Sequence, residues 1–362
     1  MKCSLIVLFL TLHTAGFTQQ LAAFNDNVRH FWVFDGGTFT QLEHLEIKEF
    51  QVGANLVAYI DNGDNLKIYQ NGKVETLMTG VPIKFTATDY LLGYSLYQQL
   101  NVFENGGNLI LSTQCSEYRV MDSLIVWYDQ INQSIKVYYK QVSYTIEDGL
   151  VFDPLKEFKL SSNMVIYHQA FARQLKLFYS GEIYILDDFA ENVAFEVGRD
   201  IAAFIDIPDQ SFKVFYRGEI IELEVFGPRS FIAGNERIAY TDNLGKLKYF
   251  VEGELIEVSG YEPQFYELKD NVLVFEEQGF LKTVCNGQTY TIERYIPPVY
   301  IIDLNTVIYY DQHQFLKGLH ACEPMQLSFE KVKEADVIRD LIIFVTGVNK
   351  TNIYFLGQIF EH

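Results

Sequence analysis

An acidic residue recurs two positions after an aromatic residue in seven places along the chain. Carboxylates repeated at such regular spacing could bind a cation or a basic partner. They could equally serve the fold, because Asp accepts hydrogen bonds from nearby backbone N–H groups and initiates turns. A fold device repeats whereas a binding site usually breaks symmetry, so the recurrence favours the structural role. The seven acids are Asp26, Asp61, Asp129, Asp206, Asp242, Glu277 and Asp311.

Two places break this pattern and are therefore better indicators of binding. His168, Gln169 and Arg173 replace the acidic stretch in one unit, and Leu96 does so in another. If the recurring acids and the residues that replace them act together, they form a rim around one face of the protein. The candidate binding rim then comprises Asp26, Asp61, Asp129, Asp206, Asp242, Asp311, His168 and Arg173.

The remaining reactive side chains match no catalytic or metal-binding motif. Residues 61–65 have a calcium-like composition, but they lack the full ligand register and the late Glu of a calcium loop. No Gly-x-Ser-x-Gly elbow, His-Glu-x-x-His pair or phosphate loop occurs. A carboxylate pair for glycoside hydrolysis would have to converge from separate units. We therefore predict no catalytic, cofactor-binding or metal-ligating residue, and no cofactor.

The acids belong to a repeat of about 35 residues, a period that is typical of repeat architectures. A glycine follows most of the repeat aromatics by about 13 residues, and a second aromatic precedes most of them by about nine. Three landmarks in fixed register make the repeat secure. The repeat aromatics are Phe24, Tyr59, Tyr94, Trp127, Tyr167, Phe204, Tyr240, Phe275, Tyr309 and Phe344.

Each unit contains four short runs rich in β-branched and aromatic residues, bounded by turn formers, which predicts four strands. We call these strands A to D; residues 231–258 are a clear example. Glycines between C and D allow the positive φ of a tight hairpin. Proline cannot donate to a sheet, so the prolines between D and the next A predict a crossing between separate units. They are Pro82, Pro154, Pro228, Pro263, Pro297 and Pro298.

Antiparallel four-stranded units joined by short crossings resemble a β-propeller. The resemblance is one of architecture, because the Trp-Asp, kelch and sialidase signatures are absent from the sequence. It implies an all-β fold of about ten four-stranded blades, the first of which lacks one strand because its repeat begins at Leu21. We expect a single large propeller over residues 19–362. The alternative is two five-bladed propellers divided near residue 190.

The first 18 residues have the pattern of a secretory signal: Lys2, a short apolar stretch and then small residues. The apolar stretch is too short to span a membrane. We therefore expect cleavage near residue 18, a secreted or periplasmic location, and no membrane span. The formal net charge of −19 argues against a nucleic-acid partner, which would require a basic patch.

Three cysteines follow this segment. Cys285 and Cys322 lie near the end of strand C in neighbouring units, so a disulfide between adjacent blades is one expectation, subject to demanding geometry. Cys115 is assigned to a D–A connection and would remain unpaired. The alternative is three buried thiols that pack as small apolar groups.

Because the repeat is clear and chemical motifs are absent, we expect a non-catalytic binding or scaffolding protein whose partner is another protein. One alternative is a propeller enzyme that acts on glycans through paired carboxylates. The other is a lectin-like protein that binds glycans through exposed aromatic side chains. An enzyme should place two carboxylates within about 5–10 Å of each other in a central pocket.

Overall fold

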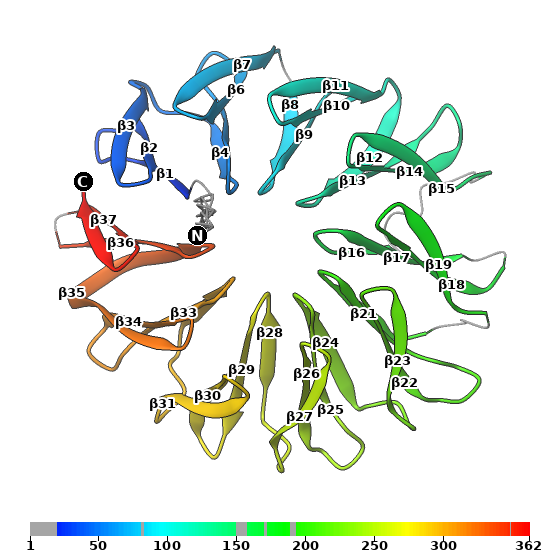
Figure 1. Cartoon of the computed structure of the whole chain (residues 1–362). Coiled ribbons are helices and arrows are strands. Elements are labelled where there is room, and N and C mark those ends of the chain that lie inside the picture. Colours follow the sequence, from blue (N-terminus) through cyan, green and yellow to red (C-terminus); the bar gives the residue numbers. More distant parts are fainter. Residues whose placement is uncertain (1–19, 81–82, 150–157, 170–171, 189–192, 348) are drawn as a thin grey trace, which may run out of the picture.

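In the computed structural model, the repeat units lie side by side around one ring (Figure 1). The structure describes residues 20–80, 83–149, 158–169, 172–188, 193–347 and 349–362. Every regular element of these residues is a β-strand, which confirms the predicted all-β class. We number the units blades 1 to 10 in chain order. Blades 2 to 8 are separate four-stranded sheets, blade 1 has three strands, and blades 9 and 10 share one seven-stranded sheet.

The strands of the first half of the ring are short and separated by tight turns. Blade 1 is β1 (Leu21–Asn25), β2 (Phe31–Asp35) and β3 (Thr38–Glu43); blade 2 is β4 (Glu49–Val52), β5 (Val57–Ile60), β6 (Asn65–Gln70) and β7 (Lys73–Thr79); blade 3 is β8 (Ile83–Ala87), β9 (Leu91–Leu96), β10 (Gln99–Glu104) and β11 (Gly107–Ser112); blade 4 is β12 (Cys115–Val120), β13 (Leu124–Asp129), β14 (Ser134–Tyr139) and β15 (Val142–Glu147); blade 5 is β16 (Lys159–Leu160), β17 (Met164–Gln169), β18 (Gln174–Tyr179) and β19 (Glu182–Asp187).

The second half repeats this plan until the last two blades. Blade 6 is β20 (Phe195–Gly198), β21 (Ile201–Ile205), β22 (Phe212–Tyr216) and β23 (Glu219–Glu224); blade 7 is β24 (Ser230–Gly234), β25 (Arg237–Thr241), β26 (Leu247–Val251) and β27 (Glu254–Ser259); blade 8 is β28 (Tyr266–Lys269), β29 (Val272–Glu277), β30 (Phe280–Cys285) and β31 (Gln288–Glu293); blades 9 and 10 are β32 (Tyr300–Asp303), β33 (Thr306–Tyr310), β34 (Phe315–His320), β35 (Glu323–Ile338), β36 (Leu341–Thr346), β37 (Lys350–Phe355) and β38 (Gln358–Glu361).

Within each sheet the strands follow sequence order and every pair is antiparallel, as the short connections predicted. Strand A lies nearest the ring centre and strand D at the periphery, as β28 and β31 show (Figure 1). The innermost strands are close to one another: a Cβ atom on Gly198 would clash with the carbonyl oxygen of Gly234 in the next blade. The A–B turns and C–D hairpins therefore share one face of the ring, and the B–C hairpins and D–A crossings share the other.

The crossing between blades 9 and 10 differs from the prediction of a break after each strand D. The single 16-residue strand β35 serves as strand D of blade 9 and continues as strand A of blade 10. Its pairing register shifts between Val332 and Glu334, and a bulge of this kind bends a strand from one sheet into the next. No proline interrupts the segment between the two blades, so the ladder has no obligatory stop there.

The ring closes by packing rather than by a shared strand. Among the described strands, β1 pairs only with β2, while blades 1 and 10 share a hydrophobic cluster that includes Ala22, Phe34 and Leu341. The ring of Phe34 lies 5.2 Å from that of Phe360 and 5.8 Å from that of Phe355. The two ends of the described chain therefore meet through side chains.

The ten repeat aromatics form the centre of each blade interface. All ten are buried, and seven of them are fully inaccessible to solvent. Full burial of an apolar side chain contributes about 1.5–3 kcal/mol, so these positions carry a large part of the stability of the ring. Their tenfold spacing is therefore explained by packing between neighbouring blades.

Candidate binding groove across blades 7 to 9

The acids that follow the repeat aromatics close the B–C hairpins. The Asp242 carboxylate accepts hydrogen bonds from the backbone N–H groups of Leu244 and Lys246, both at 2.9 Å. The Asp61 carboxylate makes the same pair of bonds to Gly63 and Asn65. This is an Asx turn, which fixes the hairpin. The calcium-like stretch 61–65 is thus one copy of a recurring turn.

The second oxygen of these carboxylates binds a lysine of strand C in the same blade. Lys67 Nζ lies 2.8 Å from Asp61, Lys136 Nζ 2.7 Å from Asp129, and Lys248 Nζ 3.2 Å from Asp242. In blade 1 the indole N–H of Trp32 takes the place of the lysine and donates to Asp26 at 2.9 Å. Burial alone would raise the pKa of Asp61, but hydrogen bonds from Lys67 and Asn65 outweigh it and lower that pKa to about 2.

The same lysines also join neighbouring blades. Lys248 Nζ lies 2.5 Å from Glu224 at the end of strand D of the preceding blade, and the buried hydroxyl of Tyr240 donates to that carboxylate at 2.8 Å. Glu43, Tyr59 and Lys67 repeat the arrangement between blades 1 and 2. The acids therefore hold turns and blade interfaces together around the ring, and the structure does not gather them into one site.

His168 and Arg173 lie on the B–C hairpin of blade 5. His168 is half-buried in β17, while Arg173 is exposed, with a φ of 55°, just before β18. Residues 170 and 171 of the same hairpin lie outside the described residues. Blades 6 to 9 carry two adjoining hollows, described below, and neither His168 nor Arg173 lines them.

A pair of carboxylates that the sequence analysis missed lies where the A–B turns meet. Asp303 Oδ2 accepts a hydrogen bond from the backbone N–H of Arg339 at 2.8 Å, and Asp270 Oδ2 accepts one from Leu304 at 3.3 Å. Burial, reinforced by the adjacent Asp270 carboxylate, raises the pKa of Asp303 to about 6. These bonds link the turns of successive blades. The sequence indicates these carboxylates only through the polar residues that precede strand B. Such residues are also typical of ordinary turns, so they do not reveal a contact between blades.

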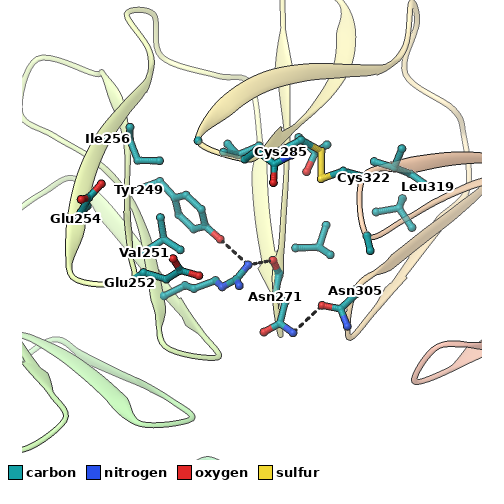
Figure 2. Close-up of a pocket in the computed structure, with 18 residues that line it drawn as sticks. Tyr249, Val251, Glu252, Glu254, Ile256, Asn271, Cys285, Asn305, Leu319 and Cys322 are labelled. Carbon is teal, nitrogen blue, oxygen red and sulfur yellow. Dashed lines mark hydrogen bonds between the residues drawn. A yellow bond between two sulfur atoms is a disulfide. The ribbon is translucent and has the colours of Figure 1, made fainter. Parts of the chain in front are cut away.

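A hollow with both polar and apolar lining residues lies on the opposite face from the Asx turns, across blades 7, 8 and 9. It has a volume of about 720 Å³, and a second hollow of about 510 Å³ adjoins it toward blade 6. The two share Arg237, Glu252 and Asn271 as lining residues, so they form one groove. Figure 2 shows Tyr249, Val251 and Ile256 on one side of the larger hollow, with Leu319 and Cys322 on the other. We call this the blade 7–9 groove.

The groove exists because two blades lack an aromatic that the others have. One position of strand C belongs to the second pair of the C–D ladder, counted from the hairpin turn. In eight blades this position holds an aromatic residue that packs between blades. In blades 8 and 9 the same register position holds the smaller Val284 and Leu319, and both line the groove. The eight aromatics are Phe34, Tyr69, Phe103, Tyr138, Phe178, Phe215, Phe250 and Tyr354.

Arg237 is a second departure at the same interface. Three residues before the repeat aromatic, the other blades have an apolar residue, or Thr306 in blade 9. Leu21 packs with Tyr69 in one hydrophobic cluster and Leu56 with Phe103 in another. Between blades 7 and 8 this aliphatic–aromatic pair is replaced by Arg237 and Val284. An arginine and free volume thus stand where two apolar side chains normally pack.

The C–D hairpins form the outer wall of the groove. Those of blades 8 and 9 are fastened together by a disulfide between Cys285 and Cys322, whose Cα atoms are 5.7 Å apart (Figure 2). The third cysteine, Cys115, is buried and begins β12, so its assignment to a D–A connection was wrong. The exposed Glu252 and Glu254 of blade 7 complete the rim.

Comparison with known families agrees with this architecture. A family model described as the 10-bladed beta propeller domain matches residues 16–360. The chain belongs to this family of ten-bladed β-propellers. No curated protein matches the chain.

The solved structures that match the chain include a computationally designed protein and natural ones. The computationally designed Ika8 protein is 14% identical, with a TM-score of 0.33, and the match covers 86% of this chain and 96% of that one. The CRINKLY WD40 ectodomain of the Arabidopsis thaliana receptor kinase ACR4 is 11% identical, with a TM-score of 0.30 and 69% and 96% coverage. Yeast RCC1 (Prp20), solved bound to Kap60, is 8% identical, with a TM-score of 0.32 and 57% and 70% coverage.

Within this ten-bladed propeller, the groove combines apolar walls with a few converging polar groups, as ligand sites commonly do. Arg237, Asn271 and Asn305 supply hydrogen-bond donors, and Glu252 supplies an acceptor. Among the residues that the structure describes, no three His, Cys, Asp or Glu side chains are arranged to hold a metal ion. No helix in the described part of the propeller is long and apolar enough to cross a membrane.

Proposed function

We propose that this propeller is a non-catalytic binding protein that holds a segment of another protein in the blade 7–9 groove. The observation that carries the proposal is the coincidence of the groove with the departures from the repeat. Val284 and Leu319 replace interface aromatics, and Arg237 replaces a buried aliphatic, all within neighbouring blades. A repeat protein that needed only to fold would keep these positions regular.

The dimensions and lining of the groove support a peptide ligand. Its two hollows follow the ring across four blades, so an extended segment of several residues fits better than a compact molecule. Val251, Ile256 and Leu319 offer apolar contact, while Asn271 and Asn305 present amide groups. Their side chains bond to each other at 2.8 Å, so part of this polar surface is held in position before any ligand binds.

A glycan-hydrolysing enzyme is less well supported. The structure does bring two carboxylates together, since those of Asp270 and Asp303 interact directly. However, both accept hydrogen bonds from backbone amides of neighbouring blades, and neither lines the groove. Carboxylates bound in this way serve to join turns.

We further propose that the protein works outside the cytoplasm. Residues 1–18 have the pattern of a secretory signal, and the Cys285–Cys322 disulfide supports an oxidising compartment. Fractionation of cells that produce the full-length chain tests this location. Recovery of a shortened chain outside the cytoplasm is expected, and an unprocessed cytoplasmic chain would contradict it.

The groove is tested by restoring the repeat aromatics. Peptides selected from a displayed random library against the wild-type protein should lose at least about tenfold in affinity on Val284→Phe, Leu319→Phe protein, because the new rings fill the hollow. The filled variant should remain as stable as the wild type or more so, since cavity filling commonly adds about 0.5–2 kcal/mol.

The matched control is Glu182→Trp. Glu182 begins strand D of blade 5, as Glu254 does in blade 7, and is exposed far along the ring from the groove. This variant adds an aromatic ring without altering the groove and should bind like the wild type. Equal binding of the selected peptides to the filled variant would refute the proposed site.

A further inference from the structure

We infer that Arg237 makes the blade 7–9 groove selective for a peptide that carries an acidic side chain within an extended segment. The inference rests on the proposed function and adds the chemistry of the ligand. It starts from the surroundings of the Arg237 guanidinium, which differ from those expected of a structural arginine.

The guanidinium is held by neutral groups alone. Nη1 donates to the backbone carbonyl of Asn271 in blade 8 and to the hydroxyl of Tyr249 at 3.4 Å. Among the described residues, no carboxylate forms an ion pair with Arg237, and Nε and Nη2 have no acceptor. The Nε atom is also shielded from solvent. A positive charge is thus fixed between two blades with one edge of its donor fork unused.

An unpaired cation in such a place is costly. Removing a charged group from water without a partner of opposite charge is unfavourable, and arginine binds carboxylates especially well through paired N–H donors. The protein carries a net charge of −19, so carboxylates are abundant elsewhere on it. Arg217, which lines the smaller hollow, does have a carboxylate partner in Glu236. The missing partner of Arg237 is best supplied by a ligand.

The position of Arg237 indicates an internal acidic residue rather than a chain terminus. It lines both hollows, and so lies where they meet. A peptide whose carboxylate reaches Arg237 can therefore extend in both directions. Glu252 lines both hollows and Glu254 the larger one, and both are exposed. They disfavour further acids on that side and favour a basic residue next to the acidic one.

The probes are nonapeptide pools with both ends blocked, so that a carboxylate can occur only at the central position. One pool has a central Glu and the other a central Gln, with the flanking positions randomised over uncharged residues and Lys. Fluorescence anisotropy with the full-length protein should show the Glu pool binding about tenfold to a hundredfold more tightly. Arg237→Gln protein should lose this preference, and Arg237→Lys should retain part of it.

The control variant is Arg29→Gln, which removes one exposed arginine that is paired with Glu46 far from the groove. It should keep the full preference for Glu. Equal affinity of the two pools for the wild type, or a preference that survives Arg237→Gln, would overturn the inference. The peptides of a third pool stop at the residue that is central in the other two pools and have an unblocked C-terminal carboxylate. If the affinity of only this pool depends on Arg237, the assignment to an internal side chain is wrong.

The filled variant separates the two proposals. If Val284→Phe, Leu319→Phe abolishes binding while Arg237→Gln leaves the preference unchanged, the groove is the site and only the carboxylate inference fails. If neither variant affects binding, the peptides bind elsewhere and both proposals fail. If no pool binds the wild type, both are likewise overturned.

Discussion

At the residue scale, a lysine at one position of strand C carries much of the polar organisation of seven of the ten blades. Lys248 lies between Asp242 of its own blade and Glu224 of the preceding one, and all three side chains are at most one-quarter exposed. Among the described residues, Lys246, two positions earlier, forms an ion pair only with Glu257, on a more exposed surface. Similar residues at neighbouring positions therefore have different roles.

Lys248→Met should lower the free energy of unfolding by about 1–3 kcal/mol, because it leaves two partly buried carboxylates without their shared cation. Lys246→Met should cost less than about 1 kcal/mol, since exposed ion pairs contribute little. Urea unfolding of the two variants measures the difference. Equal losses would show that the buried network is unimportant.

The carboxyl group of Asp303 makes stability depend on pH in the opposite sense to that of most acids. Burial raises its pKa in the folded protein to about 6, above the ordinary value of 3.8. Protonation therefore stabilises the folded state, and this contribution is present below pH 4 and lost as the pH rises through 6.

Asp303→Asn should therefore raise the free energy of unfolding at pH 7 by about 1–3 kcal/mol, and the advantage should vanish near pH 4. The amide oxygen of Asn can still accept the bond from the backbone N–H of Arg339. Urea titrations of both proteins at several pH values between 4 and 7 measure the effect. A variant that is less stable than the wild type at pH 7 contradicts the assignment.

At the element scale, the sequence predicted the regular parts of the fold well. Strands, C–D hairpins and the buried repeat aromatics could all be read from local patterns, because each depends on neighbours within one blade. The strand β35 could not, since its continuity depends on how blades 9 and 10 pack. The groove was also missed. Val284 and Leu319 are ordinary strand residues until their register against the aromatics of other blades is known.

The disulfide should stabilise the outer wall of the groove. Cys285 and Cys322 are 37 residues apart. Closing a loop of that length reduces the entropy of the unfolded chain and can raise the free energy of unfolding by up to about 4 kcal/mol. Cys285→Ser, Cys322→Ser protein should have a free energy of unfolding about 2–4 kcal/mol lower than that of the wild type. A reducing agent should destabilise the wild type but leave the double variant unchanged. Cys115→Ala protein should respond to the reducing agent as the wild type does, because the change leaves the Cys285–Cys322 disulfide in place.

At the scale of the whole molecule, each blade contacts mainly its neighbours, as in other repeat proteins. Contacts between neighbouring blades are nearly the same in one ten-bladed ring as in two five-bladed rings. The sequence pattern therefore did not distinguish the two arrangements. The single ring of the structure depends on blade 1 meeting blade 10, where no strand is shared. Closure then depends on the aromatic cluster around Phe34.

Phe34→Ala should cost about 3–5 kcal/mol, because it removes a fully buried ring from the closure interface. The variant should also expose blades 1 and 10 selectively to hydrogen exchange, whereas Phe215→Ala at the same register in blade 6 should loosen the middle of the ring. Identical exchange maps for the two variants would contradict closure by packing.

The claim that the blade 7–9 groove is the binding site is tested most directly by locating a bound peptide. A peptide selected on the wild-type protein, carrying a photoreactive residue, can be crosslinked and its attachment point found by mass spectrometry. We expect attachment within blades 7 to 9, near Tyr249, Asn271 or Leu319, and its loss in Val284→Phe, Leu319→Phe protein. Attachment to the B–C hairpins of the opposite face, unchanged in that variant, would contradict the assignment of the site.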